Sequence, residues 1–292
     1  MTDLTTEAAR APSAAAVNAR QLSRNPMGMM GLILVVIVVA SAIFAPWIAP
    51  YDPNAIMVGP RLSGPSAAHW LGTDHIGRDL FSRVVSGGRI AMLVALVTLT
   101  AAMSFGLLLG LLAGFGPKWL DNILLLIFDA IRSFPVIVFG LAVITLIGPS
   151  LYTVILVVAI TSVPIYARIV RTQTQALRTA EFILAERAMG ASTFRILGVH
   201  ILPNVLGPLL ILASMDVPLV IAVEAGLSFL GMGVRPPAPS WGTILNDGYN
   251  FIRNSPWPVI GGSLPIVLVT LGFTFLGEAL RDIFDPKLRR NL

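Results

Sequence analysis

The stretch AERAMGASTFRILGVHILPN, residues 185–204, lies between two long apolar runs and differs from both in its charges and its breaks. Gly190 can adopt the left-handed backbone that ends a helix, and Ser192 or Thr193 can cap a second one. Pro203 lacks a backbone N–H, so the second helix must end or bend there. The stretch therefore predicts two short helices at an angle, too short and too charged to cross a bilayer.

The composition indicates a membrane protein. Hydrophobic residues make up 55% of the 292 residues and charged residues only 12%, and the mean hydropathy is +0.82. A soluble domain carries about 25% charged residues. Cysteine is absent, which excludes disulfide and thiolate chemistry. The net charge of +5 fits the basic bias of cytoplasmic loops, and the sequence lacks the basic clusters interleaved with aromatics that are typical of nucleic-acid binding.

Charge-poor stretches predict an all-α membrane fold with six transmembrane helices. A helix needs about 20 residues to cross a bilayer. Backbone polar groups in lipid must pair within a helix or a closed barrel, and these runs are too long and too evenly apolar for barrel strands. The predicted spans are residues 25–51, 90–117, 121–147, 151–167 with a possible continuation past Arg168, 205–230 and 257–280.

The polar residues 1–25 are expected to form a flexible tail, followed by a transmembrane domain over residues 26–292. The first apolar run is longer than the 7–15 residues of a signal peptide, so we expect it to be retained. Six spans put 14 of the 20 lysines and arginines on the side of both termini, which places the termini and the 168–204 loop in the cytoplasm. On the other side, an amphipathic stretch with Arg78, Arg83 and Arg89 is expected at the membrane interface.

The residue spacing in the 181–203 segment leaves two interpretations open. The segment is either an amphipathic connector on the lipid surface or a docking element for a cytoplasmic partner, whose motion would pass into the adjoining spans. Both interpretations rest on apolar residues at helical spacing in each short helix, namely Phe182, Ala185 and Met189, and then Phe194, Leu197 and Ile201.

The segment resembles the coupling loop of permease subunits in bacterial ABC importers, which is named for its Glu-Ala-Ala triplet. Gly190, Leu202 and Pro203 match that pattern at the right spacing. Only the middle residue of the triplet matches, the acidic group is displaced by two positions, and a histidine takes an apolar slot. The residues that the resemblance assigns to ATPase coupling are Ala185, Glu186, Arg187, Gly190, Ala191, His200, Leu202 and Pro203.

Residues 69–89, 224–245 and 276–289 resemble the C-type permeases of dipeptide and oligopeptide importers. The resemblance implies a type I importer transmembrane domain in the inner membrane, with a homologous second permease, two ATP-binding subunits, an extracytoplasmic binding protein and a peptide substrate. ATP and Mg²⁺ would be bound by the ATPase partners, and this chain would not be an enzyme. In agreement, both lysines, Lys118 and Lys287, follow proline, so neither belongs to the Gly-Lys-Ser/Thr sequence of a P-loop.

Acidic residues inside predicted spans are candidates for the substrate path. Asp216 and Glu224 lie in the fifth span, and an intramembrane acid normally faces the protein interior or a water-filled cavity. They either line the path or form structural hydrogen bonds to neighbouring helices, and for Glu224 the structural interpretation is favoured. Asp129 and Arg132 have the i, i+3 spacing of a local ion pair.

Two histidines flank the sequence WLGTD outside the second span. His69, Asp74 and His75 do not have a recognised metal-ligand spacing, so no metal site is predicted. Thr73 or Asp74 is instead expected to start the helix that contains Arg78 and Arg83.

Two other classes of function stay open at this point. A stand-alone secondary transporter would have inverted repeats or broken helices near the midplane, and no convincing repeat is present. An intramembrane enzyme would need a nucleophile and base or a metal triad in the spans, which hold neither histidine nor cysteine. Within the permease interpretation, the cargo could also be nickel, a metallophore, a glycan or another small solute.

Overall fold

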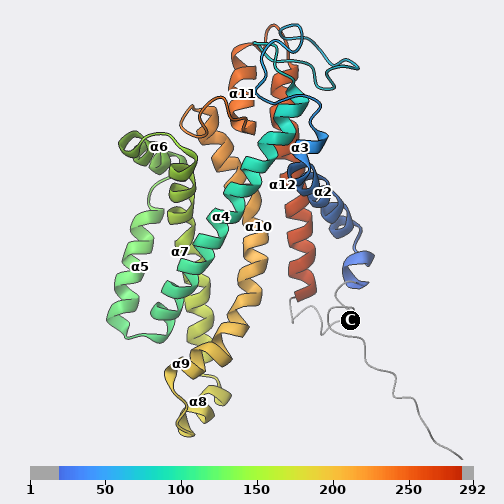
Figure 1. Ribbon diagram of the computed structural model, residues 1–292. Coiled ribbons are helices and arrows are strands. Elements are labelled where there is room, and N and C mark those ends of the chain that lie inside the picture. The colour runs from blue at the N-terminus through green and yellow to red at the C-terminus, as the bar shows by residue number, and fades with distance from the viewer. Residues whose placement is uncertain (1–19, 285–292) are drawn as a thin grey trace, which may run out of the picture.

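The computed structural model describes residues 20–284, which fold almost entirely into helices (Figure 1). Within this range there is no strand, only an isolated bridge between Thr73 and Asp79. The all-α prediction is confirmed. Residues 1–19 of the expected tail lie outside the described residues, and residues 20–24 are helical. The helices are α2 (Pro26–Ile43), α3 (Ala45–Ile48), α4 (Leu80–Phe115), α5 (Lys118–Arg132), α6 (Val136–Ile147), α7 (Leu151–Arg178), α8 (Glu181–Ala188), α9 (Thr193–Arg195), a π-helical segment (Ile196–Ile201), α10 (Leu202–Phe229), α11 (Trp241–Asn250) and α12 (Trp257–Phe284).

Five continuous helices are long and apolar enough to cross a membrane: α2, α4, α7, the helix that contains α10, and α12. The third expected span is different, because α5 and α6 form a pair bent by 87°. Pro135 has no N–H, and its ring disfavours a helical backbone at Phe134, which favours a break between the two helices at this point. The described residues therefore contain five continuous helices that can cross a membrane. The number of crossings is the expected six if the bent pair of α5 and α6 counts as one span.

The long helix α4 packs against α7 along a row of glycines. Gly106, Gly110 and Gly114 recur every four residues and share one face of α4. A methyl group added to Gly110 would lie 2.6 Å from the carbonyl oxygen of Ala167, and one added to Gly114 would lie 2.7 Å from Cβ of Thr174. Small residues at this spacing let two membrane helices approach closely. The glycines thus fix the position of α7 and of the loop that follows it.

Two ion pairs hold α5 beside α7. Asp121 pairs with Arg171, and Asp129 pairs with Arg168. The expected local pair between Asp129 and Arg132 is therefore wrong. The reason is that α7 continues helically past the end of the fourth expected span and carries Arg168 alongside α5.

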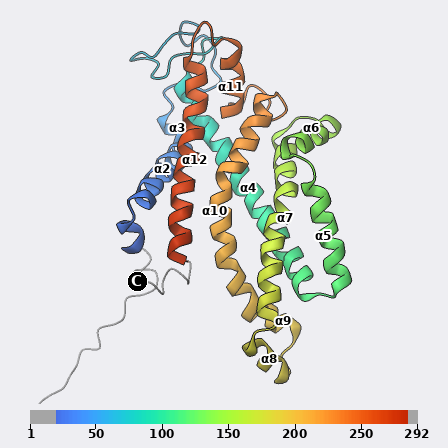
Figure 2. The ribbon, with the colours of Figure 1, turned by 180° about the vertical axis from the view of Figure 1, so that it is seen from behind.

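The segment that joins α3 to α4 is irregular and lies at the opposite end of the molecule from α8 (Figures 1 and 2). Its last residue, Asp79, caps α4, because one carboxylate oxygen accepts from the N–H of Ser82 at 2.8 Å. The other carboxylate oxygen lies 2.8 Å from Nδ1 of His69. The helix start expected at Thr73 or Asp74 is wrong, since those residues precede the cap by several positions.

Two of the three arginines expected at the membrane interface are buried instead. Arg78 is 7% exposed and pairs with Asp74 and, at 3.0 Å, with Asp247 of α11. Arg83 is 2% exposed, and its Nε lies 3.7 Å from the Asp74 carboxylate. A buried guanidinium is stable only when it is paired, and these carboxylates provide the pairing. Arg89, one turn and a half further along α4, is exposed.

The helices at the two ends of the chain lie side by side. Figures 1 and 2 both show α2 along α12, and a methyl group on Gly31 would lie 2.5 Å from the backbone nitrogen of Leu276. The start of α2, the end of α12 and the α8–α9 region are all directed toward one end of the molecule, with α11 at the other.

Candidate functional site

The turn after α8 is a helix cap that favours a glycine. The N–H of Ala191 donates to the carbonyl of Glu186 and the N–H of Gly190 donates to that of Arg187, both at 3.0 Å. These two bonds define the Schellman motif, in which the first residue beyond the helix has a left-handed backbone. Gly190 has φ +85°, which confirms the conformation expected from the sequence.

The helix after this turn runs directly into α10. Ser192 caps it, accepting from the N–H of Arg195 at 3.4 Å. The π-helical segment follows at once, and α10 begins at Leu202 without a break. The cap expected at Ser192 or Thr193 is confirmed. The result is one helix, Thr193–Phe229, whose first turns belong to residues 181–203, called the coupling segment below after the family loop that it resembles.

The sequence predicts an end or a bend at Pro203, and the end is wrong, because the helix continues through this residue. Pro203 occupies the second position of α10, directly after the π-helical turns. Such turns change the hydrogen-bond register and accommodate a residue that lacks an N–H. The side chain of Asn204 donates to the carbonyl of His200 at 2.6 Å, which gives that carbonyl a partner.

The apolar side chains of the coupling segment form an inward and an outward set. Ile183, Ile196 and Ile201 are at most 1% exposed and belong to the main core. The outward set consists of residues that are 47% to 88% exposed in this chain, namely Phe182, Leu184, Met189, Phe194 and Val199. Exposed apolar side chains in a group are typical of a surface that another protein or a membrane covers, so both interpretations of the segment remain open at this point.

Three contacts tie α8 to its neighbours. The guanidinium carbon of Arg187 lies 5.0 Å from the centre of the Phe115 ring, and that of Arg178 lies 5.5 Å from it. Such cation–π contacts attach α8 and the end of α7 to the end of α4. Nε2 of His200 lies 3.3 Å from Oε1 of Glu186 without hydrogen-bond geometry. The two residues bring α8 close to the helix Thr193–Phe229, and they form an ion pair when the imidazole is protonated.

The structure brings all eight expected coupling residues into α8, the turn after it, or the first turns of the following helix. They differ in accessibility: Ala185, Arg187, Gly190 and Pro203 are exposed, whereas Glu186, Ala191, His200 and Leu202 are half-buried.

The two acidic residues of α10 are engaged within the protein. The carboxylate of Asp216 is half-buried and accepts a hydrogen bond of 2.9 Å from the hydroxyl of Tyr166 on α7. Glu224 is fully buried, and its Oε1 accepts from Ser228 at 2.7 Å on the same helix. The hydrogen bond between Asp216 and Tyr166 is a structural bond to a neighbouring helix, which is one of the two interpretations that the sequence left open. The place of Asp216 and Glu224 in the substrate path stays a prediction.

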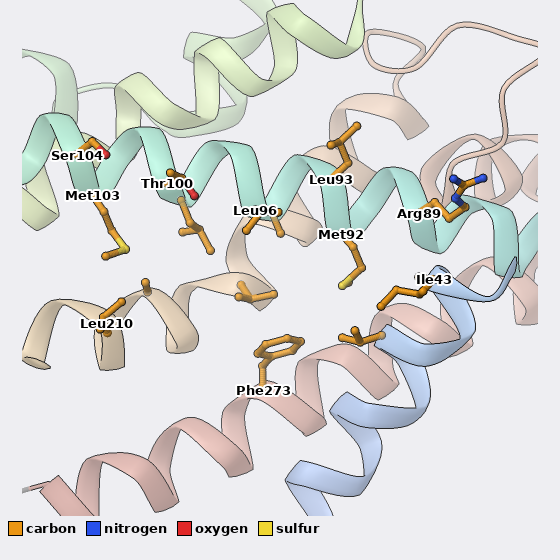
Figure 3. A pocket seen from close by; sticks show the side chains of 16 residues that line it. Ile43, Arg89, Met92, Leu93, Leu96, Thr100, Met103, Ser104, Leu210 and Phe273 are labelled. Carbon is orange, nitrogen blue, oxygen red and sulfur yellow. The ribbon is translucent and has the colours of Figure 1, made fainter. Parts of the chain in front are cut away.

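A cavity of about 820 Å³ opens between α2, α4, α10 and α12 (Figure 3). Neither Asp216 nor Glu224 is among the residues that line it, although Val217 is. Its polar residues are Arg89, Thr100 and Ser104 of α4, and the other lining residues are Val39, Ala42, Ile43, Met92, Leu93, Ala95, Leu96, Leu99, Met103, Leu210, Ala213, Val217 and Phe273.

The outer segment holds a cluster with the residue types of a metal site. Possible ligand atoms of Asp74, His75 and Asp247 lie within 4.8 Å of one another. Arg78 pairs with both carboxylates, however, and the ring of His75 stacks on that of Phe251 at 5.0 Å between centroids. Because the guanidinium groups of Arg78 and Arg83 already balance the two carboxylates, we assign the cluster to joining α11 to the segment before α4.

The sequence matches two protein-family models. Residues 106–290 match the model for a binding-protein-dependent transport system inner membrane component, and residues 16–65 match the N-terminal transmembrane domain of oligopeptide transport permease C. This chain belongs to the binding-protein-dependent transport permease family. The resemblance found in the coupling segment is thereby confirmed, and the permease is a multi-pass membrane protein of an ABC importer family.

Curated relatives cover nearly the whole permease. The dipeptide transport system permease protein DppC of Alkalihalophilus pseudofirmus is 41% identical over 270 residues, which are 92% of this chain and 89% of the relative. The probable D,D-dipeptide permease DdpC of Escherichia coli is 38% identical over 266 residues, 91% of this chain and 89% of the relative. The glutathione permease GsiD of Pectobacterium atrosepticum is 39% identical over 271 residues, 92% and 90% of the two chains.

A solved structure supports the fold of the permease. An inward-facing MetNI methionine ABC transporter superimposes with a TM-score of 0.56 at 22% identity, covering 70% of this permease and 97% of that chain. At this identity the likeness concerns the fold alone.

Sequence reasoning missed several residues of the coupling region. Phe115 gave no signal, because it ends an apolar run and its partners lie more than sixty positions away. Met189 and Phe194 were noted only as members of helical stripes. Their exposure depends on which face of each short helix packs on the bundle, and spacing alone does not determine that.

Proposed function

We propose that this permease translocates di- or oligopeptides across the cytoplasmic membrane, driven by ATP hydrolysis in partner subunits. The family assignment supports an importer, and the relatives named above are permeases for dipeptides, D,D-dipeptides and glutathione. These names favour a peptide over nickel or a metallophore. The proposed complex also contains a homologous second permease, two ATP-binding subunits that hold ATP and Mg²⁺, and an extracytoplasmic binding protein.

The observation that carries the proposal is the continuous helix Thr193–Phe229. Its first turns present Phe194 and Val199 on the surface, and its middle contributes Leu210, Ala213 and Val217 to the cavity. An apolar helix face can lie in a groove of a partner protein. A displacement of the first turns by the ATPases is then carried along the same helix to the cavity wall.

The mechanism requires no covalent chemistry in this chain. Closure of the ATPases around ATP moves α8 and the following turns together, because the Schellman turn connects them. The bundle then re-orients, and its cavity becomes open to one side of the membrane at a time. In this proposal both termini and the coupling segment are cytoplasmic, in accord with their basic residues.

The experiment is assembly of the permease with the second permease, the ATPases and the binding protein of its own organism in proteoliposomes. We expect peptide uptake that requires ATP, and ATP hydrolysis that peptide-loaded binding protein stimulates. Peptide uptake by this chain alone, driven by an ion gradient, would contradict the proposal.

A further inference from the structure

The cavity between α2, α4, α10 and α12 extends along α4 in the direction of the membrane crossing. Its α4 residues run from Arg89 to Ser104, which corresponds to about 22 Å at 1.5 Å per residue. Figure 3 shows Arg89 near Ile43, the last residue of α2, while Met92, Met103 and Phe273 occupy the apolar part. The volume of about 820 Å³ lies within the range of small-molecule sites.

Arg89 differs from the two arginines that precede it on the same part of the chain. Arg78 and Arg83 are buried and lie against carboxylates, as described above. Within residues 20–284, Arg89 forms neither an ion pair nor a side-chain hydrogen bond, and it is exposed. Arg89 directly precedes the predicted span 90–117 and lines the end of the cavity beside Ile43, so its guanidinium can bind an anion there without losing a partner in the protein.

The hydroxyls of the cavity are also free. Thr145, Thr161 and Thr270 in other apolar helices donate to a carbonyl one turn earlier in their own helix, whereas Thr98 and Thr174 have no hydrogen-bond partner among the described residues. Within the described chain, Thr100 and Ser104 form no such bond. They are one turn apart, so they can bond to the same bound molecule.

We propose that Arg89 binds the terminal carboxylate of the peptide that passes through this cavity. Every peptide with a free C-terminus carries that group, and a guanidinium binds a carboxylate through two parallel hydrogen bonds. Thr100 and Ser104 bond to the peptide backbone in place of water. The methionines and leucines around them accept side chains of different shapes, because methionine in particular adapts to its contacts. The inference rests on the peptide-importer function proposed above and assigns a recognition site to it.

Two other occupants are weaker explanations of the same cavity. A lipid acyl chain has no hydrogen-bonding group and would leave the hydroxyls of Thr100 and Ser104 without a partner. A helix of the second permease would bury Arg89, which requires an acid on that helix. The wall formed by α10 belongs to the helix that carries the coupling turns, so the cavity changes shape when that helix moves. That link is expected for a transport path.

The absence of cysteine makes a direct test available in the assembled transporter. The variant Thr100→Cys places a single thiol of this chain in the cavity, and it is labelled with a charged, membrane-impermeant thiol reagent. We expect labelling that a dipeptide with a free carboxylate suppresses. Arg253→Cys, on an exposed outer arginine, is the control that is labelled with or without peptide. No labelling at position 100, or labelling that peptide does not suppress, overturns the inference in favour of lipid or a packed partner helix.

The role of Arg89 is tested by adding Arg89→Gln to the Thr100→Cys chain. The peptide concentration that gives half-protection should rise about tenfold for the free acid and less than twofold for the C-terminal amide. Arg89→Lys should restore part of the protection, and Arg253→Gln should leave it unchanged. Equal effects on the acid and the amide overturn the assignment. ATP-dependent peptide uptake by the unmodified transporter is measured in parallel, so that a failure of the importer function is distinguished from a failure of this site.

Discussion

Tyr166 donates a hydrogen bond of 2.9 Å to Asp216 and thereby links the middle of α7 to the middle of α10. Tyr166 is fully buried, and its neighbourhood includes the close contact of α7 with the glycine row of α4. A partly buried carboxylate is stabilised by a hydroxyl donor that replaces water. Asp216 therefore has a structural bond, and the open question is whether its charge also acts on the substrate.

The pair Asp216→Asn and Tyr166→Phe separates these roles. Asp216→Asn removes the charge and keeps an acceptor, whereas Tyr166→Phe keeps the charge and removes the donor. If Asp216 contributes to the path, Asp216→Asn should leave assembly intact and slow peptide uptake several-fold. Tyr166→Phe should lower the free energy of unfolding by about 1–2 kcal/mol and preserve the uptake per assembled transporter. Unchanged uptake in Asp216→Asn removes the residue from the path.

The turn between the two coupling helices should tolerate substitution only where the backbone permits it. Gly190 has φ +85°, and no atom lies within 4 Å of a methyl group added there, so Gly190→Ala costs only the backbone strain, about 1–2 kcal/mol. We expect ATP hydrolysis to continue with weaker coupling to uptake. Gly190→Asn should be milder, since asparagine accepts this conformation.

Gly198→Ala is the matched control for that turn. Gly198 also has open space around it, but its backbone is not left-handed. The ratio of peptide transported to ATP hydrolysed should stay at the unmodified value in Gly198→Ala and fall in Gly190→Ala. The same ratio in both variants would mean that the Schellman turn is not important for coupling.

The glycine row of α4 should be sensitive to larger side chains. Gly110→Leu would force α4 and α7 apart, because the first added atom already meets backbone and Val170 at 2.6 Å. Overpacking of this kind destabilises by about 1–3 kcal/mol. We expect a lower melting temperature of the purified complex. Gly207→Leu on α10, where nothing lies within 4 Å of the added atom, should have no such effect, and equal melting temperatures would argue against the close packing.

Much of the fold could be predicted from the sequence because lipid imposes simple demands. Long runs without charges had to be helices, and left-handed Gly190 followed from its place between two helical patterns. The lack of charges predicts one span over residues 121–147, but Pro135 within it breaks the stretch into a bent pair of helices. The helix end considered at Pro203 does not occur, because the π-helical turns before it accommodate a residue that lacks an N–H.

Partners of charged residues were harder to predict. Asp129 has Arg132 at a suitable helical spacing, yet it pairs with Arg168, because α7 lies alongside α5. The sequence predicts Arg78 at the membrane interface, but in the structure it pairs with Asp247 of α11, which is 169 positions away. Local spacing cannot reveal such pairs, because they depend on which helices the fold brings together. The cavity could not be predicted for the same reason, since four separate helices line it.

The exposed ring of Phe194 should act as an anchor for the ATPase. It is 88% exposed at the start of the helix that reaches the cavity, and Met189, at 75%, lies on the turn before it. Exposed aromatic side chains that a partner buries often contribute about 2 kcal/mol or more to binding. Phe194→Ser should therefore weaken association of the ATPases with the membrane complex and reduce peptide-stimulated hydrolysis. Association is measured as the ATPase retained on the purified permease pair over a range of concentrations.

Tyr249→Ser, at an aromatic residue that is 62% exposed on α11, is the control at the other end of the molecule. It should leave ATPase retention unchanged, because the outward side chains of the coupling segment lie far from α11 (Figure 1). Retention that is the same for Phe194→Ser and for the unmodified chain would show that the outward side chains of the coupling segment do not hold the ATPase. In that case the segment would be a surface connector, and the energy for transport would have to enter the bundle elsewhere.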